Sequence, residues 1–243
     1  MSQIIFEHIS KTYGATAALR DLCLEFPDKM TTAVVGTSGS GKSTLLQHIN
    51  GLVLPSRGVV KVFEEPIDYA RLRQLRLRIG YAVQGSGLFP HLTAKQNITL
   101  LARLQKWERP RLEARAEELM RLVNLPLDYA PRYPHELSGG EQQRVGLCRA
   151  MMLDPPIFLL DEAFGALDPI TRGEVHEEFL RLQRAAPRTV VLVTHDVREA
   201  LKLGDYLVVL SKGELQQAGP CEEVVASPAT EFVRQFLRTQ LET

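Results

Sequence analysis

Three features of the 243-residue sequence predict an α/β fold built on a mainly parallel sheet. Short segments rich in Val, Ile and Leu recur along the chain, and each is followed by residues typical of turns. Helix-like stretches lie between these segments, and such alternation is typical of parallel sheets. The third feature is a region from about Leu92 to Leu153 that contains helix patterns and no good strand. We therefore expect a helical insert within an α/β core.

The predicted elements follow this pattern from the first residues to the last. The strands are expected at Ile4–Phe6, Leu22–Phe26, Thr31–Val35, Val59–Phe63, Ile79–Val83, Ile157–Leu160, Val190–Val193 and Leu207–Leu210. The helices are expected at Lys42–Leu52, Ala94–Leu104, Arg111–Val123, Glu141–Leu153, Ile170–Arg184 and Val197–Leu203. The last part, about Ser211–Thr243, reads as a small strand–helix appendage that contains the amphipathic stretch Glu231–Leu241.

Composition excludes several classes of protein. The 29 Lys+Arg and 29 Asp+Glu residues cancel, which argues against a dedicated nucleic-acid binder. With 44% hydrophobic and 24% charged residues, the chain is neither disordered nor fibrous. It has no run of eighteen apolar residues and no secretory leader pattern, so we expect no membrane span and no export. The three scattered cysteines predict reduced, mostly buried thiols.

A phosphate-binding loop is the first chemical motif. The sequence from Gly36 to Ser43 fits G-x-x-x-x-G-K-[ST] and continues into Thr44, with an apolar strand before it and a helix after it. Glycines let backbone N–H groups turn toward phosphate oxygens, and the helix N-terminus adds positive charge. Lys42 would reach the β- and γ-phosphates, and the Ser43 hydroxyl would hold Mg²⁺. The alternative is a flexible glycine turn with a surface lysine. The candidate phosphate-binding residues are Gly36, Thr37, Ser38, Gly39, Ser40, Gly41, Lys42, Ser43 and Thr44.

Two acids form a second motif at the end of a predicted strand. Asp161 and Glu162 directly follow the apolar run Ile157–Leu160, at the strand end where α/β sheets bind ligands. We expect Asp161 to bind Mg²⁺ through water and Glu162 to orient or deprotonate an attacking water. The alternative is a strand that ends in solvated acids.

A third motif opens the helix predicted after Leu137. Ser138, Gly139 and Gly140 offer bare backbone N–H groups, a hydroxyl and a helix dipole. This second anion site lies about a hundred residues from the first, so its use would be a nucleotide held between two subunits. The alternative is a serine-capped helix start, in which Glu141 closes a capping box.

With these motifs in this order, the sequence resembles the ATP-binding subunit of ABC (ATP-binding cassette) transporters over nearly its whole length. The resemblance implies the ABC ATPase type of P-loop NTPase fold, with a mainly parallel central sheet, an N-terminal antiparallel β element and a helical insert subdomain. ATP and Mg²⁺ are the implied cofactors, and a second copy of the ATPase chain is the implied partner. The implied parts are an ATP-binding core at 1–91 and 154–210, a helical subdomain at 92–153 and a C-terminal appendage at 211–243.

The resemblance also assigns roles to four further residues. Tyr13 matches the aromatic residue that stacks on adenine, although a core or turn tyrosine is the alternative. Gln84 matches the glutamine that senses Mg²⁺ and water and couples to the membrane partner, so it joins Ser43 and Asp161 as a candidate metal residue. Asp168 matches the loop that crosses the dimer interface, although Gly165 stands where many members have serine. His195 matches the histidine that contacts the γ-phosphate. The catalytic set implied is Lys42, Gln84, Glu162 and His195.

A narrower resemblance connects the chain to importers of quaternary-amine osmoprotectants such as glycine betaine, choline or carnitine. It rests on Tyr81–Leu92, Arg132–Gly146, Asp161–Arg172 and Pro228–Val233. Many of those ATPases carry a C-terminal pair of regulatory CBS domains, and this sequence ends at Thr243, too early for that, so the resemblance does not extend to their ionic-strength regulation in cis. The implied partners are two transmembrane permease subunits and, indirectly, a solute-binding protein, at the cytoplasmic face of the membrane.

Two other interpretations stay open from the sequence. Some exporters also use a free-standing ATPase subunit, and some ABC-type ATPases act on DNA or ribosomes without transport. DNA-repair relatives split the motifs with a coiled coil, and ribosomal relatives usually hold two cassettes; this sequence shows neither feature. Neighbouring genes for permeases and a solute-binding protein would favour import. The segment Gly85–His91, with Leu88 and Phe89, is a candidate docking site for the membrane subunits, and internal packing is its alternative.

Overall fold

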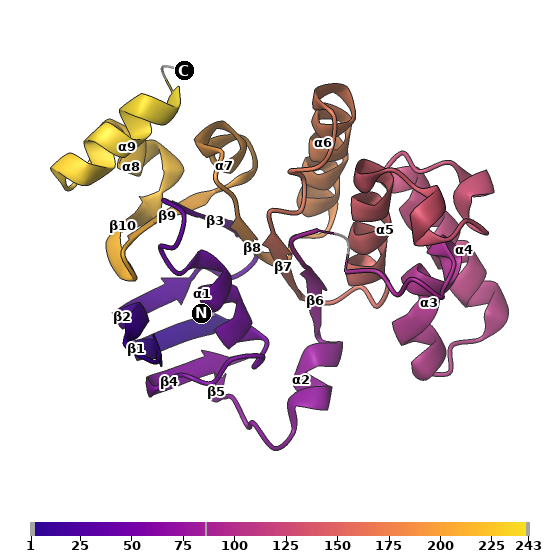
Figure 1. Ribbon diagram of the computed structural model, residues 1–243, viewed down its shortest axis with the longest axis horizontal. Coiled ribbons are helices and arrows are strands. Elements are labelled where there is room, and N and C mark those ends of the chain that lie inside the picture. The colour runs from indigo at the N-terminus through magenta and orange to yellow at the C-terminus, as the bar shows by residue number, and fades with distance from the viewer. Residues whose placement is uncertain (1–2, 86, 242–243) are drawn as a thin grey trace. The chain divides into compact units, whose positions relative to one another are not determined.

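The computed structural model describes residues 3–85 and 87–241. They form two compact bodies, shown in Figure 1. The first takes the chain up to Arg76 and again from Arg188 on, and the second takes Leu77–Pro187. Both bodies contain parallel strands with helices, so the expected α/β class is confirmed.

An antiparallel sheet occupies one side of the first body. Its strands are β1 (Ile4–Tyr13), β2 (Thr16–Phe26), β4 (Arg57–Val62) and β5 (Glu65–Pro66), in the order β2-β1-β4-β5. Alternate residues of β1 and β2, including Ile4, Phe6, Leu22 and Leu24, are buried. This alternation is typical of a sheet with one packed face. It confirms the N-terminal antiparallel β element.

A second group of strands in the first body carries the phosphate loop. β3 (Thr31–Gly36) pairs in parallel with β8 (Thr189–Val193) and with β9 (Tyr206–Ser211). β10 (Glu214–Pro220) pairs antiparallel with β9. β3 and β8 are buried along their whole length, as expected for strands covered on both faces.

Helices cover these strands. α1 (Lys42–Ile49) contacts β2 and β4 of the antiparallel sheet and β3 and β8 of the parallel strands, so it lies between the two. α7 (Val197–Leu203) packs on β3, and the tail helices α8 (Cys221–Ala226) and α9 (Glu231–Leu241) contact β10. The short helix α2 (Leu72–Leu77) ends the first stretch of this body.

The second body is mainly helical. Its parallel strands are β6 (Ile79–Ala82) and β7 (Ile157–Asp161). Its helices are α3 (Ala94–Leu104), α4 (Arg109–Leu122), α5 (Gly139–Met151) and α6 (Pro169–Ala185), with 3₁₀ turns at Leu127–Tyr129 and Pro134–Glu136. Helix α5 contacts α3, α4 and β6. All residues from Leu92 to Leu153 are described, and none of them is in a strand, as the sequence predicts.

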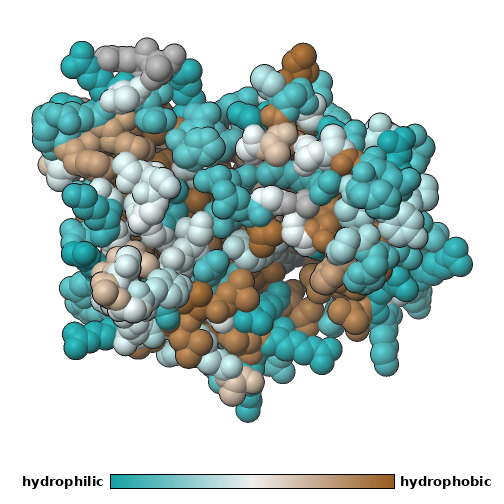
Figure 2. Space-filling view, in the orientation of Figure 1, coloured by the Kyte–Doolittle hydropathy of each residue, from teal (hydrophilic) through white to brown (hydrophobic). Residues whose placement is uncertain are grey.

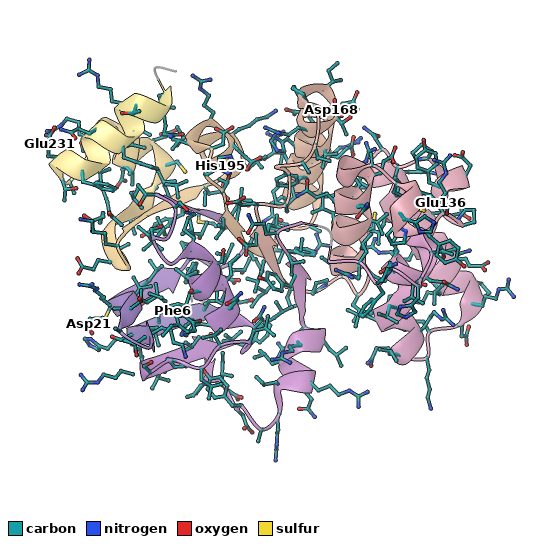
Figure 3. All side chains as sticks on the ribbon, viewed as in Figure 1. Phe6, Asp21, Glu136, Asp168, His195 and Glu231 are labelled. Atoms are coloured by element: carbon teal, nitrogen blue, oxygen red, sulfur yellow. The ribbon has the colours of Figure 1, made fainter. Side chains whose placement is uncertain are left out.

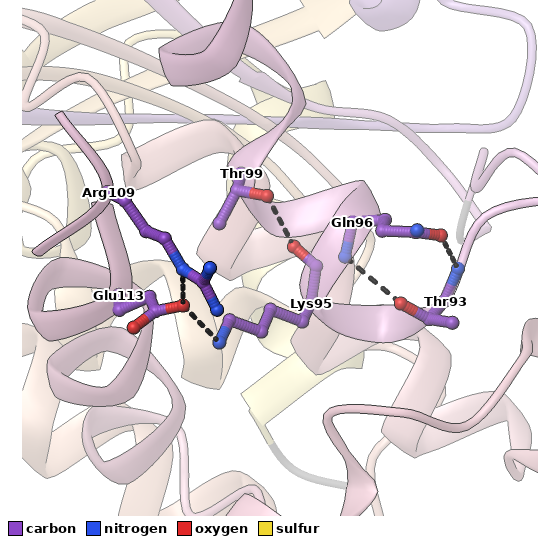
Figure 4. A network of polar contacts seen from close by, with 6 residues as sticks. All are labelled: Thr93, Lys95, Gln96, Thr99, Arg109 and Glu113. Carbon is purple, nitrogen blue, oxygen red and sulfur yellow. Dashed lines mark hydrogen bonds and ion pairs between the residues drawn. The ribbon is translucent and has the colours of Figure 1, made fainter. Parts of the chain in front are cut away.

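Polar contacts fix the start of α3 and join it to α4 (Figure 4). Thr93 and Gln96 form a capping box, in which each side chain bonds the other residue's backbone N–H. The Glu113 carboxylate on α4 accepts from Arg109 at 3.0 Å and pairs with Lys95 of α3 at 3.5 Å. These contacts, with Arg109 the larger cause, lower the pKa of Glu113.

Several predicted boundaries were wrong, and each error has a local cause. Helix α1 ends at Ile49 rather than Leu52, because Gly51 adopts a left-handed φ of 66° that ends the helix. Strand β1 runs on to Tyr13, because a bulge at His8, whose φ is 53°, interrupts the apolar alternation without ending the pairing. A similar interruption at Asp21 (φ 43°) hid the first half of β2. The elements α2, α8 and β5 were missed because each is six residues or shorter.

The face drawn in Figure 2 is mainly hydrophilic, with hydrophobic residues scattered over it. No helix in the described ranges is long and apolar enough to cross a membrane. Cys148 and Cys221 are buried and Cys23 is exposed, and all three thiols are free, so the prediction of buried thiols holds for two of them. Burial raises the pKa of the Cys221 thiol to about 11, which keeps it protonated and inert.

Candidate active site

The phosphate loop connects β3 to α1 and depends on its glycines. Gly36, Gly39 and Gly41 have φ angles of 155°, 75° and 99°. A Cβ on Gly36 would lie 2.1 Å from the Leu210 carbonyl oxygen, and one on Gly41 would lie 2.4 Å from the Ala18 carbonyl oxygen. Both contacts are too short for any side chain. The loop can therefore take this path only with glycine at these positions.

Lys42 provides the positive charge of the loop. Its side chain is 8% exposed, and its ammonium donates to the carbonyl oxygens of Gly36 at 2.9 Å and Thr37 at 3.0 Å. The loop therefore curls around its own lysine. Such a curl keeps the ammonium inside the loop rather than in solvent.

The start of α1 suits an anion. Its N-cap is Gly41, which has no side chain to cap the first N–H groups, and its first turn contains no acidic residue. The first N–H groups of a helix carry a partial positive charge. The uncapped helix start, the inward lysine and the glycine backbone together fit a phosphate chain.

His195 lies at the same sheet edge as the phosphate loop. Val34 of β3 pairs with Val193 of β8, and two residues further along each strand come Gly36 and His195. Parallel strands end on the same side, so both residues lie beyond the carboxyl ends of neighbouring strands. His195 is exposed and directly precedes Asp196, the N-cap of α7 (Figure 3). The role of His195 as a phosphate contact stays a prediction.

Tyr13 lies at the tip of the β1–β2 hairpin. It pairs with Thr16, its ring is half exposed, and the Lys11 ammonium lies 5.0 Å from the ring centroid. Ala18 of the same hairpin approaches Gly41, as the clash of a Cβ there indicates. An exposed aromatic face is thus carried on the hairpin that passes the start of α1.

A second set of predicted residues meets in the other body. Ala82 of β6 pairs with Leu160 of β7, and two residues beyond them Gln84 and Glu162 touch. The Gln84 Nε2 donates to Glu162 Oε2 at 3.0 Å. Asp161 ends β7 with only 4% of its surface exposed, and the Tyr81 hydroxyl lies 3.5 Å from its Oδ2. The structure therefore brings together an amide and two adjacent carboxylates, as two neighbouring parallel strands predict.

Ser138, Gly139 and Gly140 open helix α5. Ser138 is the N-cap, and it forms the capping box with Glu141 that the sequence offered as an alternative. A Cβ on Gly139 would touch nothing within 4 Å, so this glycine faces open space. The capping role is therefore present, and the helix start remains accessible.

Asp168 caps helix α6. Its carboxylate, labelled in Figure 3, accepts from the Thr171 N–H at 3.0 Å. Hydrogen bonds from Thr171, with its side chain the larger cause and its backbone N–H the next, lower the pKa of Asp168. The next residues include Ile170, whose side chain is 77% exposed. The loop that the sequence predicts at a dimer interface thus presents an aspartate and a bare apolar side chain.

One buried contact near Glu162 was not predicted from the sequence. Gln143 of α5 bonds the Glu162 carbonyl oxygen and the Ala166 N–H. The residue lies within Arg132–Gly146, one of the stretches that carry the narrower resemblance, but nothing in the sequence showed which neighbours its amide would meet.

Comparison with known proteins gives the family. The ABC transporter family model matches residues 19–165, which include the phosphate loop, Ser138–Gly140, and Asp161 and Glu162 at the end of β7. The chain belongs to the ABC transporter family, as one of its ATP-binding chains.

Particular relatives narrow this result. The chain is 48% identical over 96% of its length to the glycine betaine uptake system ATP-binding protein YehX of Escherichia coli (strain K12), and covers 76% of that protein. It is 46% identical over 95% of its length to the glycine betaine/carnitine/choline transport ATP-binding protein OpuCA of Bacillus subtilis (strain 168), and spans 61% of it. The chain therefore covers only part of both relatives.

Solved structures agree in fold. A dimeric structure of a post-hydrolysis state of the ATP-binding cassette MJ0796, bound to ADP and Pi, has a TM-score of 0.84 and 31% identity. The match covers 90% of this chain and 98% of the chain in that structure. The cbiO1 protein of Clostridium perfringens, part of the ABC transporter complex cbiONQ, has a TM-score of 0.82 and 26% identity, with coverage of 99% and 96%.

Proposed function

We propose that the chain is the ATP-hydrolysing motor subunit of an importer for quaternary-amine osmoprotectants. The contact between Gln84 and Glu162 beside Asp161 carries the hydrolytic part of the proposal, because it presents an oriented carboxylate next to a buried acid. The names of the relatives at 46–48% identity, which mention glycine betaine, carnitine and choline, support the cargo class.

The phosphate loop and the acids are proposed to serve one ATP. The loop from Gly36 to Thr44 binds the phosphates, Lys42 balances their charge, and the exposed ring of Tyr13 stacks on the adenine. His195 contacts the γ-phosphate, and Glu162 orients and deprotonates the attacking water. A bound Mg²⁺, for which the donors are the Ser43 hydroxyl, the Gln84 amide and the Asp161 carboxylate, would neutralise developing charge on the phosphates.

A second copy of the chain is proposed to complete the site. Ser138, Gly139 and Gly140 of that copy would bind the γ-phosphate through their hydroxyl and N–H groups. The open space beside Gly139 and the exposed side chain of Ile170 near Asp168 support a partner on this surface. ATP binding would close the dimer, and hydrolysis would reopen it.

The segment Gly85–His91, in which residue 86 lies outside the described residues, is proposed to take part in docking to the permease subunits, of which the transporter has two. These subunits would place the chain at the cytoplasmic face of the membrane. Phe89 supports this role because its ring is 44% exposed. Asn97 of α3 holds the backbone of Phe89 by donating to its carbonyl and accepting from its N–H. A helical subdomain at 92–153 would then carry the movement, with a solute-binding protein delivering the cargo on the other side.

Glu162→Gln tests the hydrolytic role. The substitution keeps size and hydrogen bonding but removes the basic oxygen, so ATP turnover should fall by about 10²–10⁴-fold. ATP binding should survive, because the phosphate contacts come from the loop. The trapped ATP should hold two chains together, and gel filtration with ATP and Mg²⁺ should show a shift from monomer to dimer.

A matched control uses a second carboxylate that accepts from a side-chain amide. Glu174 accepts from the Asn124 Nδ2 at 2.9 Å, and Glu174→Gln should keep the parent rate. If Glu162→Gln hydrolyses ATP as fast as the parent chain, Glu162 is not the base. If it is inactive, binds ATP and stays monomeric, the proposed two-chain site is wrong.

A further inference from the structure

Gln143 is a buried glutamine whose amide is fully directed toward one turn. Its side chain projects from α5 and is 5% exposed. The Nε2 group donates to the Glu162 carbonyl oxygen at 2.8 Å, and the Oε1 atom accepts from the Ala166 N–H at 2.9 Å. A carbonyl can only accept and an N–H can only donate, so the two partners fix which way the amide points.

The turn that this amide closes has an unusual backbone. Glu162 has a φ of 48°, in the left-handed region that favours glycine. Such a residue keeps this conformation only when its surroundings hold it there. The Gly165 N–H also bonds the Glu162 carbonyl, at 3.2 Å, but Gln143 spans the turn from Glu162 to Ala166 and links it to a helix.

Glu162 is therefore held at two points. Gln84 bonds its carboxylate at 3.0 Å, and Gln143 bonds its backbone. A base must be held within about 0.5 Å of its productive position, and a misplacement of about 1 Å costs about 10²-fold in rate. We infer that Gln143 is a positioning residue, which holds the left-handed turn so that the Glu162 carboxylate faces the attacking water. This inference rests on the proposed role of Glu162 as the base.

Gln143→Met tests the inference, because methionine keeps the length of the side chain and removes both hydrogen bonds. We expect the kcat for ATP hydrolysis by the full chain to fall about 10- to 100-fold. The KM and the affinity for a fluorescent ATP analogue should stay at the parent values, because the phosphate loop keeps its own contacts. A loss confined to kcat is what displacement of the base predicts.

Thr99→Val is the matched control, because it also removes a buried polar group. Thr99 is 2% exposed, and its hydroxyl bonds only the Lys95 carbonyl within α3 among the described residues. The kcat of the Thr99→Val chain should equal that of the parent chain. The melting temperatures of both variants, followed by circular dichroism, show that each is folded at the assay temperature. A slow Thr99→Val variant would overturn the inference, because any buried polar loss would then have the same effect.

A double-mutant comparison shows whether Gln143 acts through Glu162. In the Glu162→Gln chain, adding Gln143→Met should cause no further loss of kcat, because the group that Gln143 positions is already disabled. If the loss of kcat in the double variant equals the product of the losses in the two single variants, the inference is wrong. If Glu162→Gln is slow and Gln143→Met alone keeps the parent kcat, the inference fails and the proposed function stands. If Glu162→Gln itself keeps the parent rate, the proposed role of Glu162 fails first.

Discussion

Lys42 shows how a charged residue can be buried before it meets a phosphate. Its ammonium bonds two carbonyl oxygens of its own loop, and this satisfies the charge at 8% exposure. These partners are neutral, so a phosphate would be a stronger one for the same cation. The residue is therefore placed to exchange loop carbonyls for phosphate oxygens.

Replacement of this lysine tests its assignment to the phosphate loop. Lys42→Ala removes a charge-assisted contact of about 1.5–3 kcal/mol, so ATP affinity should fall about 10- to 100-fold. Hydrolysis should be abolished, because the same cation would stabilise charge on the γ-phosphate. Nucleotide titration and ATPase assays measure both effects. Lys95→Ala, which removes an exposed lysine paired with Glu113, should change neither, and unchanged affinity and turnover in Lys42→Ala would contradict the assignment.

Ser138 shows that a capping role and a binding role are compatible. Its Oγ accepts from the Glu141 N–H at 3.3 Å, which uses a lone pair of the hydroxyl. A hydroxyl also has a proton to donate. The capping box therefore fixes the helix start without consuming the donor that a phosphate would need.

At the scale of elements, helix α1 is attached to the antiparallel sheet partly through a buried histidine. His48 is fully buried, and its ring lies 6.3 Å from the ring of Phe6 on β1. Its Nδ1 bonds the Thr44 carbonyl at 2.6 Å, and its Nε2 has no hydrogen-bond partner among the described residues. Burial is the main cause that lowers the pKa of His48 below 6.5, so the ring is neutral in the fold.

This attachment predicts a loss of stability in acid. Above pH 7, His48 is neutral whether the chain is folded or unfolded. As the pH falls below 6.5, the unfolded chain binds a proton there and the folded chain resists it. The free energy of unfolding should then fall by up to about 1.4 kcal/mol per pH unit from this residue, until the lowered pKa of the folded state is reached.

Urea unfolding between pH 7.5 and 5 measures the effect. His48→Asn keeps a donor for Thr44 and removes the titration, so its stability should depend less steeply on pH than that of the parent. His135→Asn, at an exposed position, should follow the parent curve. Parallel curves for His48→Asn and the parent would show that His48 is not the source of the acid sensitivity.

Elements could be predicted from the sequence where one local signal dominated. The bounds of α3 and α7 agree with the prediction, because Thr93 and Asp196 are clear caps and the apolar period is unbroken. Strands β1 and β2 were cut short because left-handed residues at His8 and Asp21 shift the register. Non-glycine residues seldom adopt such angles, so the two left-handed residues could not be predicted from the sequence.

The candidate site likewise combines residues that were predicted from the sequence with contacts that were not. Gln84 and Glu162 were each predicted as site residues at the end of a strand. They meet because β6 and β7 are parallel neighbours, a pairing that the structure shows and that the sequence did not predict. The bridge from Gln143 to the Glu162 turn could not be predicted, because it depends on how α5 packs and on a left-handed φ at Glu162. Side-chain partners across helices need tertiary geometry, whereas strand ends need only topology.

At the scale of the whole molecule, the predicted catalytic residues come from both bodies. Lys42 and His195 belong to the first, and Gln84, Glu162 and the Ser138 helix start belong to the second. The sequence-based division into parts at 91, 153 and 210 stays a prediction. If a single chain supplied all the groups of one ATP site, a defect in its phosphate loop or in its Ser138 helix start would inactivate only the site of that chain. If two chains share each site, defects in different motifs should complement each other.

The last prediction uses this distinction. Ser138→Arg should spare ATP binding by the single chain and block closure, because a bulky cation replaces the small cap. Lys42→Ala should bind ATP weakly and lose hydrolysis at its own phosphate loop, but it should keep its own Ser138 helix start. In a mixed dimer, the intact phosphate loop of one chain then faces the intact Ser138 of the other. An equal mixture should recover up to about a quarter of the parent rate, since half of the dimers are mixed and each has one complete site. A mixture of Lys42→Ala with a chain that carries both substitutions contains no complete site and should stay inactive. If labelled chains form mixed dimers without any recovery of ATPase activity, the proposed site shared between two chains is wrong, and the observed capping box is the role that remains for Ser138.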